Sequence, residues 1–480
     1  MKQSPLKATI WSFIERFSSQ FVGILIGMIL ARLLSPQDYG IVGLTTIFIT
    51  ISNVFIDSGF GNGLIRKEHR TEEDLSTAFY FNIIVGFFAY SMLYVFSPLI
   101  ARFFYEPELL LLIKIVGLNV IFNSLSIVQT AILTANLNIR LQTIINICSQ
   151  IPAGLVAIYL AYCGFGIYAL AWQAVSASFI KVLLLWRMTK WKPMLIFSVA
   201  SFKYLWSFGS KLLGANLIGT AFNEIYSVLI GKYIGKQDLG YYSKSNHLNA
   251  SVDSISTGII QKISLPILSK YQSEKDMLAD KYRFIMRLLV MFMAPIIAIL
   301  CVTSKDIIII LWSEKWIQCA VIFQLLVIGT IFNPISNLSL SLLQSVGRSD
   351  LILKLEIPKK IIYSLYIALG FYFGILGLVV ARILINLTAA LINMWATKKV
   401  LNYSYMHQLG DIFKYILIII VLSGISVIMV DSFNPIMNIL MHTMVISFMY
   451  ILLLYSINDI TYYQLLSKVR DYFKMSKGNI

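Results

Sequence analysis

Charged side chains within otherwise apolar segments are the residues of this sequence best suited to chemistry. The basic candidates are Arg16, Lys211 and Arg382, and the acidic candidates are Glu15, Glu224 and Asp253. A charge near the centre of a bilayer costs about 2.5 to 3.5 kcal/mol on insertion scales, so it usually faces protein or a water-filled cavity. Because a guanidinium binds a phosphate through two parallel hydrogen bonds, the basic candidates predict a site for an anionic group.

Two polar helix faces are expected to present these charges to a cleft. The faces are Arg16, Ser19 and Gln20 in the first apolar segment, and Lys211, Asn216 and Glu224 in the seventh. The spacing on the first segment is helical, which puts its polar residues on one side. The residues leave an alternative open, in which the charges pair with one another, for example Lys211 with Glu15 or Glu224. Lys181 and Arg287 are expected instead to extend to the membrane interface.

The elements that must position these residues are membrane spans. The chain has 480 residues, of which 58% are hydrophobic and 13% charged, a composition that excludes an ordinary water-soluble domain. We predict an all-α polytopic membrane protein with about 14 transmembrane helices. These lie at roughly residues 8–31, 39–60, 76–100, 109–133, 141–162, 166–186, 204–230, 243–268, 284–303, 317–343, 352–373, 375–395, 411–430 and 436–457.

The basic residues predict the orientation. With the N-terminus in the cytoplasm, 23 lysine and arginine residues fall on the cytoplasmic side and seven on the opposite side. Cytoplasmic loops carry such an excess, so both termini are expected to be cytoplasmic. The net charge of +16 is then explained by loops that face anionic lipid headgroups, and nucleic acid is not an expected partner.

A faint internal repeat divides the chain. Residues 31–40 share Gln, Asp and Gly with residues 231–240 at matching positions, and Ile121-Phe-Asn123 reappears as Ile331-Phe-Asn333. Duplicated helical halves with a site between them are typical of secondary transporters. The predicted parts are an N-terminal lobe (1–187), a cytoplasmic linker (188–203), a C-terminal lobe (204–397), two additional spans (398–457) and a cytoplasmic amphipathic tail (458–480). The two six-helix lobes would be related by a pseudo-two-fold axis along the membrane normal.

The energy source is expected to be an ion gradient. The sequence has no phosphate-binding loop of the Gly-x-x-x-x-Gly-Lys-Ser/Thr type, which argues against ATP hydrolysis. Coupling to Na⁺ or H⁺ through Glu15, Glu224 or Asp253 is the remaining common mechanism. In the repeat, Asp253 corresponds to Asn53. No cofactor is expected, and the scattered cysteines and histidines predict no metal site.

Two stretches resemble the opening of a known family. Ile29-Leu-Ala-Arg-Leu-Leu-Ser-Pro-Gln-Asp-Tyr-Gly-Ile-Val-Gly43 and Asp57-Ser-Gly-Phe-Gly-Asn-Gly-Leu-Ile-Arg66 are similar to the Wzx-type polysaccharide flippases of the multidrug, oligosaccharidyl-lipid and polysaccharide exporter superfamily. The resemblance implies a fold like that of the multidrug exporters of this superfamily. It also implies a flippase that moves a polyprenyl-diphosphate-linked oligosaccharide across the bacterial inner membrane by alternating access, with a polysaccharide polymerase and glycosyltransferases as partners. Arg16, Lys211 and Arg382 would bind the diphosphate.

Three other functions are alternatives to the polysaccharide flippase. A peptidoglycan-precursor flippase shares the span plan and the cationic cavity, whereas a cation-coupled multidrug exporter would have a more acidic cleft. A membrane glycan polymerase needs catalytic acids or bases, usually on large extracytoplasmic loops. The expected loops are too short for that, so we predict that the protein is not an enzyme.

Overall fold

The computed structural model describes residues 5–57, 59–401, 403–430 and 434–467. Within these ranges, the side chains of residues 5–10, 12, 13, 16, 255, 256, 259–263, 349 and 353 lie outside the description. The chain divides into two compact units, Met1–Ser243 and Lys244–Ile480, which we call unit 1 and unit 2. Each unit is described by itself.

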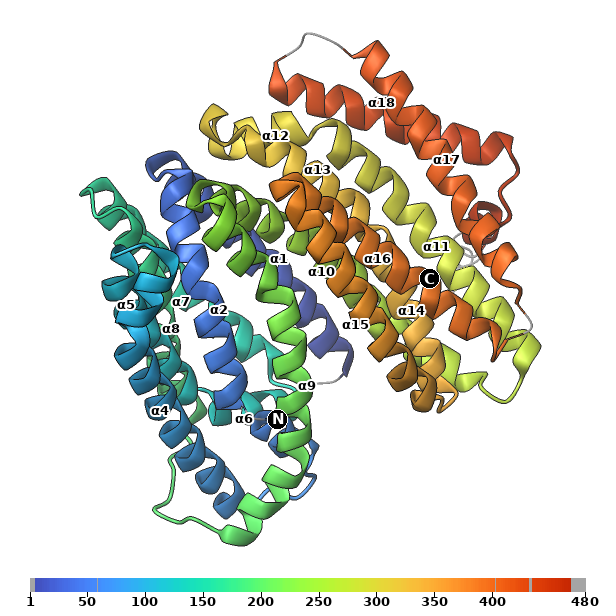
Figure 1. Ribbon diagram of the computed structural model, residues 1–480. Coiled ribbons are helices and arrows are strands. Elements are labelled where there is room, and N and C mark those ends of the chain that lie inside the picture. The colour runs from blue at the N-terminus through green and yellow to red at the C-terminus, as the bar shows by residue number, and fades with distance from the viewer. Residues whose placement is uncertain (1–4, 58, 402, 431–433, 468–480) are drawn as a thin grey trace, which may run out of the picture. The chain divides into compact units, whose positions relative to one another are not determined.

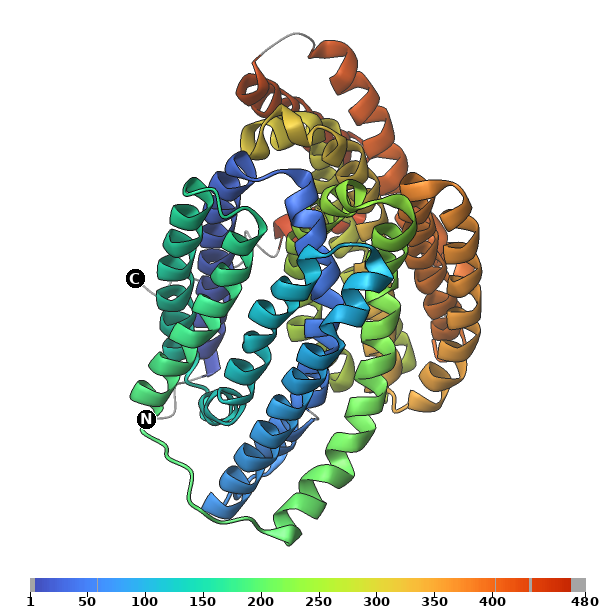
Figure 2. The same cartoon turned by 60° about the vertical axis from the view of Figure 1, so that its left-hand side comes forward.

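Unit 1 is a bundle of long helices that pack both against neighbours in sequence and against helices distant in sequence. Its helices are α1 (Pro5–Leu33), α2 (Pro36–Asp57), α3 (Phe60–Arg66), α4 (Glu72–Phe104), α5 (Glu108–Ser124), α6 (Ile127–Ala135), α7 (Ile139–Tyr162), α8 (Ile167–Thr189), α9 (Val199–Leu229) and the π-helical turn η1 (Ile230–Ile234). The helices α1, α7 and α8 lie side by side (Figures 1 and 2), and α2 packs against α5 and α9.

Unit 2 begins within α10 (Lys236–Lys270). It continues with α11 (Lys275–Val302), α12 (Ser304–Trp312), the 3₁₀ turn η2 (Glu314–Trp316), α13 (Gln318–Thr330), α14 (Phe332–Ser345), α15 (Ser349–Tyr372), α16 (Gly374–Lys398), α17 (Tyr405–Met429) and α18 (Pro435–Ser456). Here α16 packs against α13, α14 and α15, and α11 packs along α17.

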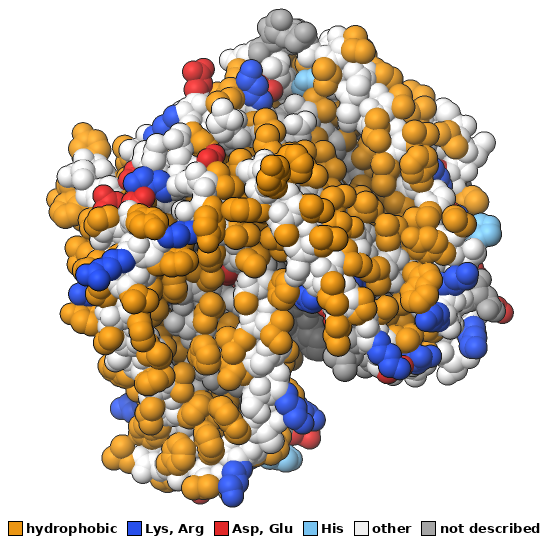
Figure 3. Space-filling view, viewed as in Figure 1, with side chains coloured by type: hydrophobic (Ala, Val, Ile, Leu, Met, Phe, Trp, Pro, Cys, Tyr) orange, Lys and Arg blue, Asp and Glu red, His pale blue; other side chains and the backbone are white. Residues whose placement is uncertain are grey.

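The prediction of an all-helical, multi-pass membrane protein is confirmed. Helices cover all fourteen predicted segments, and in the described residues every regular element is a helix or a helical turn. Nine helices of this part are long and apolar enough to span a membrane, or ten if the bent pair α5 and α6 counts as one. Hydrophobic side chains dominate the face shown in Figure 3. The number of fourteen spans and the predicted lobe boundaries stay predictions.

Matching hydrogen bonds in the two units agree with the internal repeat. In unit 1 the amide of Asn123 donates to Asn53 Oδ1 over 3.0 Å. In unit 2 the amide of Asn333 donates to Asp253 Oδ1, also over 3.0 Å. These four residues are the ones that the repeat aligns, so each half has the same kind of contact at positions that correspond in the repeat.

The Gln-Asp-x-Gly motif of each repeat has a packing role at the start of α2 and α10. A Cβ atom on Gly40 would lie 1.7 Å from the backbone oxygen of Lys236, and one on Gly240 would lie 1.9 Å from that of Pro36. The two helices therefore cross in direct backbone contact, which only glycine permits. Asp38 caps the turn before α2, because its carboxylate accepts hydrogen bonds from the Ser35 backbone (2.8 Å) and hydroxyl (2.7 Å).

The chain beyond α18 is tied back onto unit 2 through Asp459. Its carboxylate accepts hydrogen bonds from Lys414 Nζ and from the Tyr415 hydroxyl. Burial raises the pKa of Asp459, but the bonds from Lys414 and the Tyr462 backbone outweigh burial and leave the pKa below its usual value. Of the predicted tail, 458–467 is described, with helix from 460, and 468–480 lies outside the described residues.

The backbone contact between α2 and α10 at Gly40 and Gly240 predicts that glycines of this chain differ sharply in how well they tolerate replacement by alanine. Replacing Gly40 or Gly240 by alanine forces α2 and α10 apart, which we expect to lower stability by about 1 to 3 kcal/mol, seen as a lower melting temperature of the detergent-solubilised protein. The matched control is Gly23→Ala in α1, where a Cβ meets nothing within 4 Å. Equal melting temperatures for all three variants would contradict the claim that the glycines of the Gln-Asp-x-Gly motif are needed for the close contact of α2 with α10.

Candidate functional site

Two broken helices face each other in unit 1. The first break separates α2 from α3 at Gly59, whose φ of 72° is left-handed. The second separates α5 from α6, whose axes differ by 43°. Irregular backbone at membrane depth is tolerated where it is buried in protein or lines a cavity, and such breaks mark binding sites in transporters.

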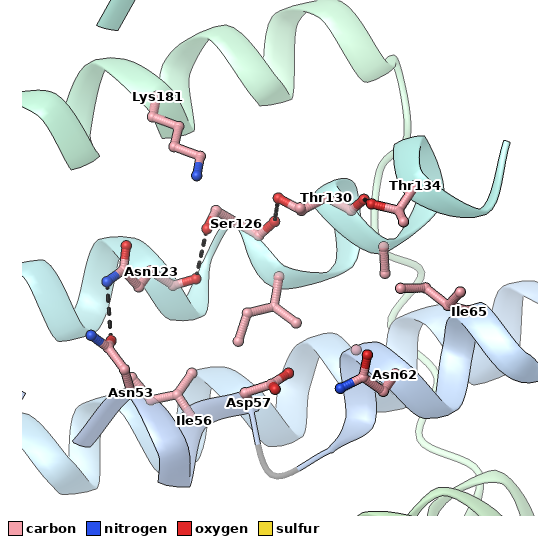
Figure 4. Close-up of a pocket in the computed structure, with 13 residues that line it drawn as sticks. Asn53, Ile56, Asp57, Asn62, Ile65, Asn123, Ser126, Thr130, Thr134 and Lys181 are labelled. Carbon is pink, nitrogen blue, oxygen red and sulfur yellow. Dashed lines mark hydrogen bonds between the residues drawn. The ribbon is translucent and has the colours of Figure 1, made fainter. Parts of the chain in front are cut away.

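A polar cavity of about 320 Å³ lies between these breaks (Figure 4). The residues that line it come from α2, α3, α5, α6 and α8 or their connections, and the polar ones are Asn53, Asp57, Asn62, Asn123, Ser126, Thr130, Thr134 and Lys181. The hydrogen bond between Asn53 and Asn123 crosses one end of the cavity. The sequence predicts a site role for none of these residues, although its internal repeat relates Asn53 to Asp253 and Asn123 to Asn333.

Lys181 brings a positive charge into this cavity from α8. Its side chain points from α8 toward the helices that carry Asn123 and Ser126 (Figure 4). It interacts electrostatically with Glu15 of α1. A half-buried acidic partner and polar walls thus lie around the ammonium in unit 1, and the expectation that Lys181 extends to the membrane interface stays a prediction.

Glu15 is itself fixed in place by a neighbouring helix. Its carboxylate accepts a hydrogen bond of 2.6 Å from the amide of Asn146 in α7. Glu15, Asn146 and Lys181 thus connect α1, α7 and α8, the three helices that pack side by side in this unit. Of the acids that the sequence proposes for ion coupling, Glu15 is the one connected to the cavity of unit 1.

The corresponding place in unit 2 is charged. Asp253 of α10 accepts the hydrogen bond from Asn333 of α14, and Arg382 of α16 acts electrostatically on Asp253. Two of the predicted site residues, Asp253 and Arg382, are therefore neighbours. In each unit a basic residue of the last helix of the predicted lobe, Lys181 of α8 or Arg382 of α16, interacts electrostatically with an acid.

The remaining predicted residues lie along α1 and α9. Lys211 and Asn216 are exposed on α9, and Glu224 accepts a hydrogen bond of 3.3 Å from Ser227. Within the described residues Lys211 forms no ion pair, so pairing with Glu15 or Glu224 is not what the structure shows. Ser19 and Gln20 are half-buried on α1, and Arg16 lies on the same helix with its side chain outside the described residues. The role of Arg16, Lys211 and Arg382 as diphosphate ligands stays a prediction.

A cluster that the sequence did not predict joins α11 and α17. Asp411 accepts hydrogen bonds from Arg283 (Nε, 2.7 Å), from Arg287 and from the hydroxyl of Tyr403. The side chains of Arg287 and Asp411 are 12% and 10% exposed. Arg287 thus neutralises a buried carboxylate, and the expectation that it extends to the interface is wrong. Among the described residues, no three His, Cys, Asp or Glu side chains are grouped to hold a metal ion.

Comparison with known sequences gives a consistent result. Residues 29–321 match the family described as "Polysaccharide biosynthesis protein". Teichuronic acid biosynthesis protein TuaB of Bacillus subtilis is 26% identical over 415 residues, 85% of each chain. Succinoglycan biosynthesis transport protein ExoT of Rhizobium meliloti is 21% identical over 342 residues, 70% of this chain and 68% of that one.

Solved structures show the same fold. The lipid II flippase MurJ in an inward closed conformation superposes with a TM-score of 0.73 at 14% identity, covering 94% of this chain and 99% of that one. An inward-facing multidrug transporter of the MATE family superposes with a TM-score of 0.59 at 14% identity, covering 81% and 98%. The predicted fold, that of the multidrug, oligosaccharidyl-lipid and polysaccharide exporter superfamily, is confirmed.

The Asp411 cluster predicts a strong dependence of stability on one carboxylate. In Asp411→Ala the buried guanidinium of Arg287 loses its partner, and we expect a loss of about 3 kcal/mol, measured as a fall of several degrees in melting temperature. The matched control is Asp350→Ala, whose partner Arg348 is 45% exposed and which should melt like the wild type. A wild-type melting temperature for Asp411→Ala would show that the cluster does not hold α11 against α17.

Proposed function

This chain belongs to the polysaccharide biosynthesis protein family, and from that premise we propose that it is a flippase for a lipid-linked oligosaccharide. Its substrate would be a polyprenyl-diphosphate-linked repeat unit of O-antigen, capsule or exopolysaccharide. The protein would move it from the cytoplasmic to the outer leaflet of a bacterial inner membrane by alternating access of two helical halves.

The observation that carries this proposal is the family match over residues 29–321, on a chain whose fold is that of membrane transporters. The relatives named above are called biosynthesis proteins of teichuronic acid and of succinoglycan, and the second is called a transport protein. A flippase needs no catalytic group, only a path for a polar head through the membrane, so the proposal includes no enzymatic step.

The proposed binding of the diphosphate rests on Arg16, Lys211 and Arg382. Lys211 supports this role because its ammonium is exposed on α9 and forms no ion pair within the described residues. Arg382 has a carboxylate beside it, so a diphosphate would compete with Asp253 for the guanidinium. Such an exchange of partners would link substrate binding to the charge of a buried acid.

We further propose that both termini are cytoplasmic and that a Na⁺ or H⁺ gradient drives transport through Glu15, Glu224 or Asp253. Glycosyltransferases that build the lipid-linked unit and a polymerase that consumes it are the expected partners. A peptidoglycan-precursor flippase is the second candidate, which the fold of MurJ favours. A multidrug exporter is the third, and the basic candidate residues count against it.

The first experiment identifies the lipids that copurify with the protein. Mass spectrometry should find a polyprenyl-diphosphate glycan, and cells lacking the gene should accumulate the same compound unflipped. A peptidoglycan precursor in its place would support the second candidate. Bulk phospholipid alone, with an unchanged lipid-linked pool in the deletion strain, would overturn the proposal.

Removal of the basic residues should abolish transport. We expect Arg16→Ala, Lys211→Ala and Arg382→Ala each to lower flipping in cells by tenfold or more at equal protein level, because each removes a charge-assisted contact to the diphosphate. Arg16→Lys should retain part of the activity, since it keeps the charge but loses the bidentate geometry. The readout is the surface polysaccharide formed by a complemented deletion strain.

The controls separate substrate binding from internal pairing. Lys203→Ala removes another exposed ammonium from α9 and should behave as wild type. If Arg382 only neutralises Asp253, the double variant Asp253→Asn with Arg382→Ala should regain activity, whereas a diphosphate ligand cannot be rescued in this way. Wild-type transport in all three alanine variants would exclude the cationic site.

If transport is coupled to a Na⁺ or H⁺ gradient, one of the three candidate acids should be required for the gradient to change the rate of flipping. Asp253→Asn recreates in unit 2 the amide pair that unit 1 already has between Asn53 and Asn123, so the variant should fold. In proteoliposomes we expect Glu15→Gln, Glu224→Gln or Asp253→Asn to make flipping independent of an imposed Na⁺ or H⁺ gradient. Asp350→Asn, an exposed acid outside the spans, is the control. An unchanged gradient response in all three variants would exclude coupling through these acids.

A further inference from the structure

The cavity of unit 1 has a charge balance that does not suit a diphosphate. It contains one ammonium, that of Lys181, and one carboxylate, that of Asp57, and the rest of its polar lining is amide and hydroxyl. A diphosphate carries its negative charges on adjacent phosphates, and a carboxylate within the same small cavity would repel them. The ligand that this lining matches is polar and uncharged.

The hydrogen-bonding groups of the lining both donate and accept. The hydroxyl of Ser126 donates to the backbone oxygen of Asn123 and that of Thr130 to the backbone oxygen of Ser126, each over 2.8 Å. With their protons used, both hydroxyl oxygens can only accept from a ligand. Lys181 supplies donors, and the exposed amide of Asn62 supplies both kinds of group.

The lining also has apolar parts between the polar groups. Ile56 and Ile65 contribute hydrocarbon surface from α2 and α3, opposite the hydroxyls of α6 (Figure 4). A sugar ring has hydroxyls that donate and accept around its edge, and C–H groups on its faces. Pockets that orient a ligand with a few polar groups on a mainly apolar lining are the usual form of a small-molecule site.

We propose that this cavity binds a sugar ring of the lipid-linked oligosaccharide. The inference rests on the proposed function and deepens it, because it assigns glycan recognition to unit 1 and to residues other than the basic candidates. The ring would donate hydroxyl protons to Ser126 and Thr130, and would accept hydrogen bonds from Lys181 and Asn62.

The test compares two lipids on the purified full-length protein. One probe is the polyprenyl-diphosphate oligosaccharide extracted from the native host, and the other is polyprenyl diphosphate without sugar. Binding of each is measured by native mass spectrometry or thermophoresis. We expect Thr130→Val and Asn62→Leu to weaken binding of the first by about tenfold each, and to leave binding of the second unchanged.

The matched control for Thr130 lies on α2. Thr50 donates to the backbone oxygen of Thr46 over 2.7 Å, the same i to i−4 bond that Thr130 makes, and it does not line the cavity. Thr50→Val should bind both lipids as wild type does. Because Thr130 and Asn62 stand on different helices, a folding defect in one variant leaves the other as an independent test.

The outcomes separate the two proposals. Equal binding of the glycan lipid by wild type and both variants, or an equal loss for the two lipids, overturns the sugar site and leaves the flippase proposal intact. A wild-type protein that binds neither lipid overturns the proposed function, and the sugar site with it. A loss confined to the glycan-bearing lipid, with Thr50→Val unchanged, supports the sugar site.

Discussion

The structure depends on one constraint: in hydrocarbon, every backbone N–H and C=O must find its hydrogen-bond partner within the protein. Long helices meet this constraint along most of the chain. The interruptions between α2 and α3, and between α5 and α6, lie where polar side chains line the cavity of unit 1. Their backbone groups still find partners in the chain, as in the hydrogen bond from the Gly63 N–H to the Gly59 oxygen and in that from the Ser126 N–H to the Asn123 oxygen.

The duplication preserved contacts of the helices and changed the chemistry of the site. Asn53 with Asn123 and Asp253 with Asn333 occupy aligned positions of the repeat and make hydrogen bonds of the same length, but one pair is neutral and the other carries a charge that interacts with Arg382. An amide and a carboxylate have the same shape, so this exchange costs little packing. The repeated fold thus offers two polar positions of different charge, one in each unit.

Hydropathy predicted the helices well because their apolar runs are long. The predicted and observed ends differ mainly where a polar turn extends the helix, as at Lys275 in α11. The break between α5 and α6 was predicted as one continuous span, since Leu125 and Ser126 carry no glycine or proline signal. The Asp411 cluster was also missed, because its arginines lie 124 and 128 residues away and no local pattern relates them.

Charge identifies the predicted site residues in the sequence, but charge alone does not determine the direction in which a side chain points. Lys181 and Arg287 have the long stems that reach a membrane interface, yet each has an acidic partner on another helix, Glu15 for Lys181 and Asp411 for Arg287. The direction of a lysine or arginine in a span is decided by such tertiary partners, which outweigh the cost of keeping the charge inside.

Separate sites for the two parts of the proposed substrate have a physical advantage. The diphosphate is common to all lipid carriers of this kind, so basic residues that bind it give affinity without selecting a glycan. Selection of one glycan over another requires protein groups that lose a hydrogen bond when a sugar hydroxyl is missing or misplaced. A buried polar group that is left without its partner is strongly unfavourable. In the cavity of unit 1, Ser126 is a buried group of this kind and Thr130 a half-buried one, while exposed Lys211 has only its charge. Under the proposed function, the amide and hydroxyl groups would select the glycan. The basic residues, which the sequence predicts by their charge, would bind the part of the substrate that all such lipid carriers share.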